Sequence, residues 1–260
     1  MAIGNLPACL AVTLKHEGGW SDHPKDPGGA TMNGVTLAVF RKYHPGATKD
    51  DLRAISDEDV QRIYRVGYWN PVRGDSLPAG VDLATFDFAV NSGVSRGAKA
   101  LQAAVGAAVD GMVGPMTVAL AGRVDPVKTV QAICGKRLSF VRGLSTFSTF
   151  GKGWSRRIAD IEARGVKMAV GKLPVSLAMR AVEFEADAAK RRASAQDKVA
   201  AGGAAAGGWG GLIETAGADV NWWIVACVVI AALAVAAFVK SRANVNRERA
   251  AAYDRVLKEG

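Results

Sequence analysis

Two consecutive glycines at positions 18 and 19 separate an apolar helical pattern from a turn rich in proline and glycine. Before them, Leu6, Leu10 and Leu14 recur at helical spacing and predict a helix with one apolar face. Glycine commonly ends helices, so this helix is expected to stop at Glu17. The segment that follows has to form turns, because its prolines and glycines disfavour a helix.

Glu17 is the first candidate catalytic residue. The last carbonyls of a helix carry a partial negative charge, so a carboxyl group at this end should resist ionisation. Trp20 is expected to shield the group from water, which acts in the same direction, and it is a candidate contact for substrate. A carboxylic acid that stays protonated near neutral pH can protonate a leaving oxygen, which predicts a general acid at position 17. Adjacent helical residues face different sides, so direct coupling of His16 to Glu17 is not expected.

Asp26 is the candidate partner of Glu17. It lies nine positions further on, in the turn, where it should stay solvated and ionised. One neutral and one charged carboxyl group are what cleavage of a glycosidic bond requires, with the charged group acting as base on a water molecule or as nucleophile. Thr31 adds a hydroxyl that would hold this water. Each acid alone has an ordinary explanation, since Glu often precedes Gly-Gly at helix ends and Asp is a routine turn residue.

The sequence Glu-Gly-Gly at 17–19, followed by Pro-x-Asp-x-Gly-Gly-x-Thr at 24–31, resembles the opening of phage-type muramidases of glycoside hydrolase family 108. The resemblance implies a mainly α, lysozyme-like catalytic domain that acts on peptidoglycan, with Glu17, Asp26 and Thr31 in catalytic roles. Related phage lysozymes carry Glu, Asp and Thr at similar spacing. The spacing from Asp26 to Thr31 is one residue shorter here, which bears on how the hydroxyl is aligned.

An aromatic pair, Tyr68 and Trp69, follows a predicted helix that Ser56 and Asp59 should cap. Aromatic rings stack well on the apolar faces of sugars, so the pair is a candidate for substrate binding. Packing of both rings in the core or an interface is the competing interpretation.

Asp87 and Asn91 lie four positions apart in a helical pattern that Gly93 should end. This spacing puts both side chains on one helical face, where they are candidates for lining the substrate site. A purely local hydrogen bond of Asn91 at the helix end is equally compatible with the pattern.

Residues 92–121 resemble the small helical peptidoglycan-binding module that family members carry fused to the catalytic half. The resemblance lies in Ala100-Leu101-Gln102, Asp110-Gly111 and Gly114-Pro115-x-Thr117. The glycines and the proline predict a turn between two helices. The resemblance continues through Trp154 and Arg157 to about residue 165, where basic side chains would meet anionic wall polymer or simply face solvent. The expected domains are a catalytic half, residues 1–92, and a peptidoglycan-binding half packed on it, residues 93–170.

Composition and charge narrow the classes of protein. With 260 residues, 49% of them hydrophobic, the chain is long enough for one buried helical domain plus appendages. A net charge of +9 suits polyanions such as the bacterial wall, lipid headgroups or nucleic acid. No nucleic-acid-binding signature accompanies the charge, so no nucleic-acid partner is expected. The three cysteines and three histidines form no metal or cofactor motif, so neither a metal nor a cofactor is expected.

The character of the chain changes after about residue 171. Residues 171–221 contain a charged, alanine-rich helical pattern and then a glycine and alanine run, which predicts a flexible linker. The 18 residues from 222 to 239 carry no charge and predict a single transmembrane helix. The tail, residues 240–260, has six Lys or Arg against three Asp or Glu. The positive-inside rule then predicts a cytoplasmic C-terminus and a periplasmic catalytic domain at the host inner membrane.

The first 20 residues show no signal-peptide pattern, so the route of export is open. Three alternatives follow: the late helix drives translocation, a phage holin-type protein releases the enzyme, or the helix inserts the other way round with the domain in the cytoplasm.

Two functions follow from these patterns. The first is hydrolysis of the bond between N-acetylmuramic acid and N-acetylglucosamine in phage-induced lysis, with lytic transglycosylation as a close variant. The second is a non-catalytic, membrane-anchored protein that binds peptidoglycan or regulates lysis. The two carboxyl groups favour the first.

Overall fold

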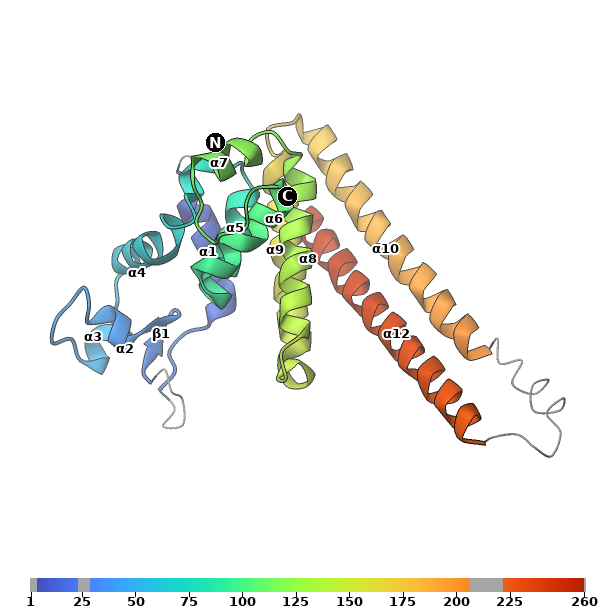
Figure 1. Ribbon diagram of the computed structural model, residues 1–260. Coiled ribbons are helices and arrows are strands. Elements are labelled where there is room, and N and C mark those ends of the chain that lie inside the picture. Colours follow the sequence, from blue (N-terminus) through green and yellow to red (C-terminus); the bar gives the residue numbers. More distant parts are fainter. Residues whose placement is uncertain (1–3, 23–28, 206–221, 260) are drawn as a thin grey trace. The chain divides into compact units, whose positions relative to one another are not determined.

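The structure is a computed structural model that describes residues 4–22, 29–205 and 222–259 (Figure 1). It divides into two compact units, Met1–Leu173 and Pro174–Gly260. Both units are built mainly from helices, which confirms the predicted fold class in this respect. Asp26 lies outside the described residues.

The first unit contains one small hairpin, in which β1 (Thr31–Met32) pairs antiparallel with β2 (Val35–Thr36). The remaining elements of the unit are helical: α1 (Leu6–Glu17), α2 (Leu37–Phe40), α3 (Lys49–Arg53), α4 (Asp57–Tyr64), the π-helix η1 (Arg65–Trp69), the 3-10 helix η2 (Gly74–Ser76), α5 (Val81–Ser92), α6 (Val94–Val105), α7 (Pro115–Ala121), α8 (Pro126–Arg142) and α9 (Phe147–Val170).

Local signals place the helix ends where the sequence predicts them. Helix α1 ends at Glu17, and Gly18 adopts a φ of 78° that suits glycine. The side chain of Ser56 accepts a hydrogen bond from the backbone N–H of Asp59 at 3.1 Å and so caps α4. Helix α5 ends before Gly93.

Helix α5 is the centre of the first unit. Its residues 81–89 are all buried, because α1, α6, α8 and α9 surround it. A helix covered on every side needs partners for its polar groups. Asp82 finds one in Asn5, whose side-chain amide donates to the carboxylate at 2.7 Å and ties the start of α1 to α5. Burial raises the pKa of Asp82 to about 6.

Helices α5 and α9 meet at two glycines. Gly80, just before α5, has a φ of +83°, and a Cβ there would collide with the carbonyl oxygen of Gly165 in α9. A Cβ at Gly165 would itself lie 2.9 Å from Val130 of α8. The absence of side chains at both positions lets the backbones approach closely. Helix α9 is thereby held against the helix that carries Asp87.

The second unit consists of two long helices, α10 (Val175–Ala205) and α12 (Trp222–Lys258), which pack on each other. Lys190 bonds Asp254 at 3.0 Å, and Asp197 pairs with Arg247, so the two helices run antiparallel. The buried residues of the two helices include six alanines, Ala186, Ala189, Ala193, Ala243, Ala250 and Ala252, together with the larger Val182, Tyr253 and Val256.

The predicted linker and membrane helix differ from what is described. Helix α10 continues to Ala205 and so includes the first glycines of the expected linker, while residues 206–221 lie outside the described residues. For the expected membrane span, residues 222–239, the structure describes only some of the side chains. Among the described residues, no helix is both long enough and apolar enough to cross a bilayer, so the predicted span is unsupported. In the structure this segment forms the first half of α12, which continues into a charged half.

Candidate active site

Glu17 is the last residue of α1, and its side chain keeps 20% of its surface exposed. Its Oε1 accepts a hydrogen bond from Nη2 of Arg157 at 2.6 Å. Arg157 comes from α9, 140 positions further along the chain. Glu17 is therefore held beside a guanidinium group. The prediction made from the end of α1 alone did not include this distant partner.

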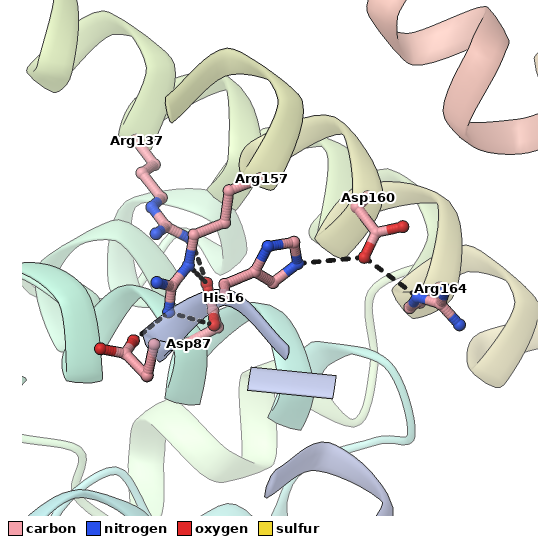
Figure 2. Close-up of polar contacts among 7 residues, drawn as sticks. His16, Asp87, Arg137, Arg157, Asp160 and Arg164 are labelled. Carbon is pink, nitrogen blue, oxygen red and sulfur yellow. Dashed lines mark hydrogen bonds and ion pairs between the residues drawn. The ribbon is translucent and has the colours of Figure 1, made fainter. Parts of the chain in front are cut away.

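Arg157 is fixed in turn by Asp87 of α5. Its Nε donates to Oδ2 of Asp87 at 3.1 Å, and its Nη2 donates to Oδ1 at 2.8 Å. Nη1 of Arg137, from α8, donates to the same oxygen, Oδ2 of Asp87, as Nε of Arg157 (Figure 2). Asp87 is fully buried, so its partners are these two arginines and it lines no open surface.

The charges of this group are mutually stabilised. Burial alone would raise the pKa of Asp87, but the two arginines outweigh it and lower the pKa to about 2. Burial would likewise lower the pKa of Arg157, but the Asp87 and Glu17 carboxylates outweigh it and raise the pKa. Both residues thus stay charged throughout the physiological range.

The hairpin lies against the carboxyl group of Glu17. Gly34, in the turn between β1 and β2, has a φ of +75°, and a Cβ there would lie 3.2 Å from both Cγ and Oε2 of Glu17. The same Cβ would collide with the hydroxyl of Tyr64, which donates to the carbonyl oxygen of Asn33 at 2.9 Å. Glycine at position 34 therefore leaves Oε2 of Glu17 uncovered by a side chain from this turn.

The two aromatic residues predicted for sugar binding both lie in the π-helix η1, but they differ in burial. Trp69 is fully buried and packs edge-on against Phe86, with ring centroids 5.4 Å apart. Tyr68 is half-buried beside Tyr64, with centroids 5.6 Å apart. Burial, followed by the charge of Glu17, raises the pKa of both tyrosines, which places both near the carboxylate. Of the pair, only Tyr68 is therefore open to a ligand near Glu17.

The other predicted site residues lie as follows. The Thr31 hydroxyl donates to the carbonyl oxygen of Gly29 at 3.1 Å and stands in β1. The ring of Trp20 is half-buried and lies under the guanidinium of Arg53, at 4.5 Å, so its described contact is with α3. Asn91 is exposed, and its side-chain oxygen accepts a local hydrogen bond from Ser92 at 3.1 Å.

A second contact joins the end of α1 to α9. Nε2 of His16 lies 3.1 Å from Oδ2 of Asp160, which also accepts a hydrogen bond from Arg164 at 3.0 Å (Figure 2). His16 and Glu17 thus bind positions 160 and 157 of α9, one helical turn apart. This pair of contacts fixes the end of α1, and with it the direction of the Glu17 side chain.

The segment predicted to resemble a peptidoglycan-binding module is organised by Gln102. Its buried side-chain amide donates to Asp110 at 2.6 Å and to the carbonyl oxygen of Met112 at 3.0 Å, and it accepts from the backbone N–H of Gly111 at 2.9 Å. This network fixes the turn between α6 and α7. Helix α7 begins at Pro115, so Thr117 lies within its first turn and is buried.

In the described part of the chain, no group of three or more His, Cys, Asp or Glu side chains has an arrangement able to hold a metal ion. The arrangement that the structure does describe is a partly exposed carboxyl group on a buried, charge-balanced support.

Arg157, Arg137, Tyr64 and Gly34 are the residues of this site that sequence reasoning missed. Arg157 had been considered only as a basic residue for wall polymer or solvent. A signal was present, because Arg157 and Asp160 alternate with Ile158 and Ile161 within one helical pattern. Charges that share a helix with apolar residues on several faces indicate buried ion pairs.

Comparisons with known proteins identify the family. Residues 10–93 match the family model of glycosyl hydrolase 108. The solved structure of SagA from Brucella abortus is 41% identical to the chain, covering 64% of this chain and 96% of that one, with a TM-score of 0.57. None of the curated proteins matches. The mainly helical fold and the family match are thus those of a glycosidase. The chain belongs to glycosyl hydrolase family 108.

Proposed function

We propose that this protein is an N-acetylmuramidase, which hydrolyses the bond between N-acetylmuramic acid and N-acetylglucosamine in peptidoglycan. The observation that carries the proposal is the carboxyl group of Glu17, which is held by Arg157 yet partly exposed and lies within the segment matched to the family. A fixed carboxyl group that reaches solvent is what protonation of a leaving glycosidic oxygen requires.

The roles proposed for the residues follow from their atoms. Oε1 of Glu17 is occupied by Arg157, so Oε2 is the oxygen that carries the proton to the leaving group. Asp26 acts as the base that takes a proton from the attacking water molecule. The Thr31 hydroxyl donates its hydrogen to Gly29, which leaves its lone pairs to accept a hydrogen bond from that water. Tyr68 is the aromatic contact for a sugar ring.

The biological setting that we propose is phage-induced lysis of a bacterial host, with the catalytic unit acting in the periplasm, where peptidoglycan lies. The net charge of +9 supports approach to an anionic wall. Release by a holin-type phage protein is the partner interaction that this setting requires. This proposed setting rests on the family match and on peptidoglycan as the expected substrate.

Mass spectrometry of the products tests the reaction. Purified full-length protein is incubated with peptidoglycan, and the released muropeptides are analysed. Hydrolysis is expected to give muramic acid with a reducing end. Anhydro-muramic acid ends would show transglycosylation in place of hydrolysis. Binding to peptidoglycan without any release would overturn the catalytic proposal and favour the wall-binding alternative.

Gly34→Ala is expected to lower the rate of glycan cleavage by at least about tenfold, because the new methyl group meets Tyr64 and displaces the Glu17 carboxyl group. The left-handed backbone at this position adds a strain of about 1–2 kcal/mol. The rate of release of reducing ends measures the first effect, and thermal unfolding measures the second.

Gly46→Ala is the matched control. Gly46 has a φ of +84°, similar to that of Gly34, but a Cβ there would have no atom within 4 Å. The control shares the backbone strain and lacks the collision, so it should lose stability and keep the rate. Equal rates for the two variants would show that the turn does not position Glu17.

A further inference from the structure

We infer that Arg157, which lies outside the segment matched to the hydrolase family, is the positioning residue that fixes the Glu17 carboxyl group for catalysis. The inference rests on the proposed function of Glu17 as the acid. It assigns a part of the active site to α9, in the half of the first unit that was expected only to bind peptidoglycan.

The geometry leaves the guanidinium group of Arg157 little freedom. Nε and one hydrogen of Nη2 form a two-pronged contact with Asp87, at 3.1 Å and 2.8 Å. The second hydrogen of Nη2 then points to Oε1 of Glu17, at 2.6 Å. A planar fork that is fixed at one carboxylate presents its remaining hydrogen in a defined direction. Glu17 is thus oriented by a donor that cannot turn away without breaking the pair with Asp87.

The support beneath this contact is buried. Asp87, Arg137 and Arg157 are 0%, 2% and 8% exposed, so water cannot easily replace their contacts. The orientation of Arg157, and with it the position of the Glu17 carboxyl group, is thus set by buried contacts.

Two substitutions separate the charge of Arg157 from its geometry. Arg157→Met removes both, so the maximal cleavage rate should fall at least about tenfold. Arg157→Lys keeps the charge without the fork. Its maximal rate should fall similarly, while the KM for peptidoglycan stays within about twofold of the wild-type value in both variants, because the lost contact acts on the acid.

The experiment uses the full chain and measures kcat and KM with purified peptidoglycan. Arg62→Lys is the control, because Arg62 pairs with Asp59 at 2.9 Å on α4 while 51% exposed. Its kcat should equal that of the wild type.

The outcomes distinguish this inference from the proposed function. An unchanged kcat for Arg157→Lys, or a loss that appears only in KM, overturns the inference while the wild type still cleaves peptidoglycan. If Arg157→Met does not fold, as judged by circular dichroism, the Lys variant alone decides through its rate. If the wild type releases no reducing ends, the proposed function fails and the inference, which rests on it, fails with it.

Discussion

Replacing Glu17 by Gln is expected to lower the rate of peptidoglycan cleavage by about 10²–10⁴-fold, the usual contribution of a general acid. The amide has the shape of the carboxyl group, and its oxygen is still able to accept the hydrogen bond from Arg157. It has no acidic proton to give to the leaving oxygen. Binding of peptidoglycan should therefore persist while release of reducing ends is lost.

Glu58→Gln is the control for this substitution, because Glu58 is an exposed residue in the first turn of α4 and has no proposed role in catalysis or binding. Its rate should equal that of the wild type. A Glu17→Gln variant that cleaves as fast as this control would show that Glu17 is not the acid. Loss of both binding and helical content would instead show a failure to fold, which circular dichroism detects.

The parts of the fold that the sequence predicts are those governed by local chemistry. Helix α1 ends at Glu17 because glycine follows, α4 begins after Ser56 because its hydroxyl caps the helix, and α5 stops at Gly93. Each signal acts over four residues or fewer, so no knowledge of the tertiary structure is needed to interpret it.

The environment of Glu17 depends on contacts that are far apart in sequence. The end of α1 predicts a carboxyl group that resists ionisation, but Arg157 reaches it from 140 positions away. Local sequence shows which residues are able to form an ion pair, but it does not show which partner the packing of helices brings within reach. Here the close contact of Gly80 with Gly165 brings α9, which carries Arg157, against α5.

Burial also divides residues that sequence spacing groups together. Tyr68 and Trp69 are adjacent, yet Trp69 packs in the core and Tyr68 stays half-buried. Asp87 and Asn91 share a face by spacing, yet Asp87 is enclosed by two arginines and Asn91 is exposed. The sequence pattern of α5 does not predict this difference between Asp87 and Asn91, because the helix is buried on every side along residues 81–89 and has no solvent face there.

Asp87→Asn is expected to destabilise the first unit by about 3–5 kcal/mol at neutral pH, the usual cost of removing one partner from a buried ion pair. Arg137 and Arg157 would remain buried, with Glu17 as the one negative charge among the contacts described for this group. A loss of this size lowers the melting temperature by on the order of 10 °C in a unit of this length. Asp22→Asn is the control, because Asp22 pairs with Lys49 at 2.9 Å while 32% exposed, and a surface pair contributes about 0–1 kcal/mol.

The pH dependence of this loss identifies its cause. The pKa of Asp87 is lowered to about 2 in the folded protein, against about 3.9 in an unfolded chain. A lowered pKa gives stability that is fully present above the unfolded value and is lost as the pH falls through the folded value. The difference in melting temperature between wild type and Asp87→Asn should therefore be constant from about pH 7 to 5 and shrink between about pH 4 and 2. A difference that stays the same down to pH 2 would mean that Asp87 stabilises the unit through its shape and hydrogen bonds, with no contribution from its charge.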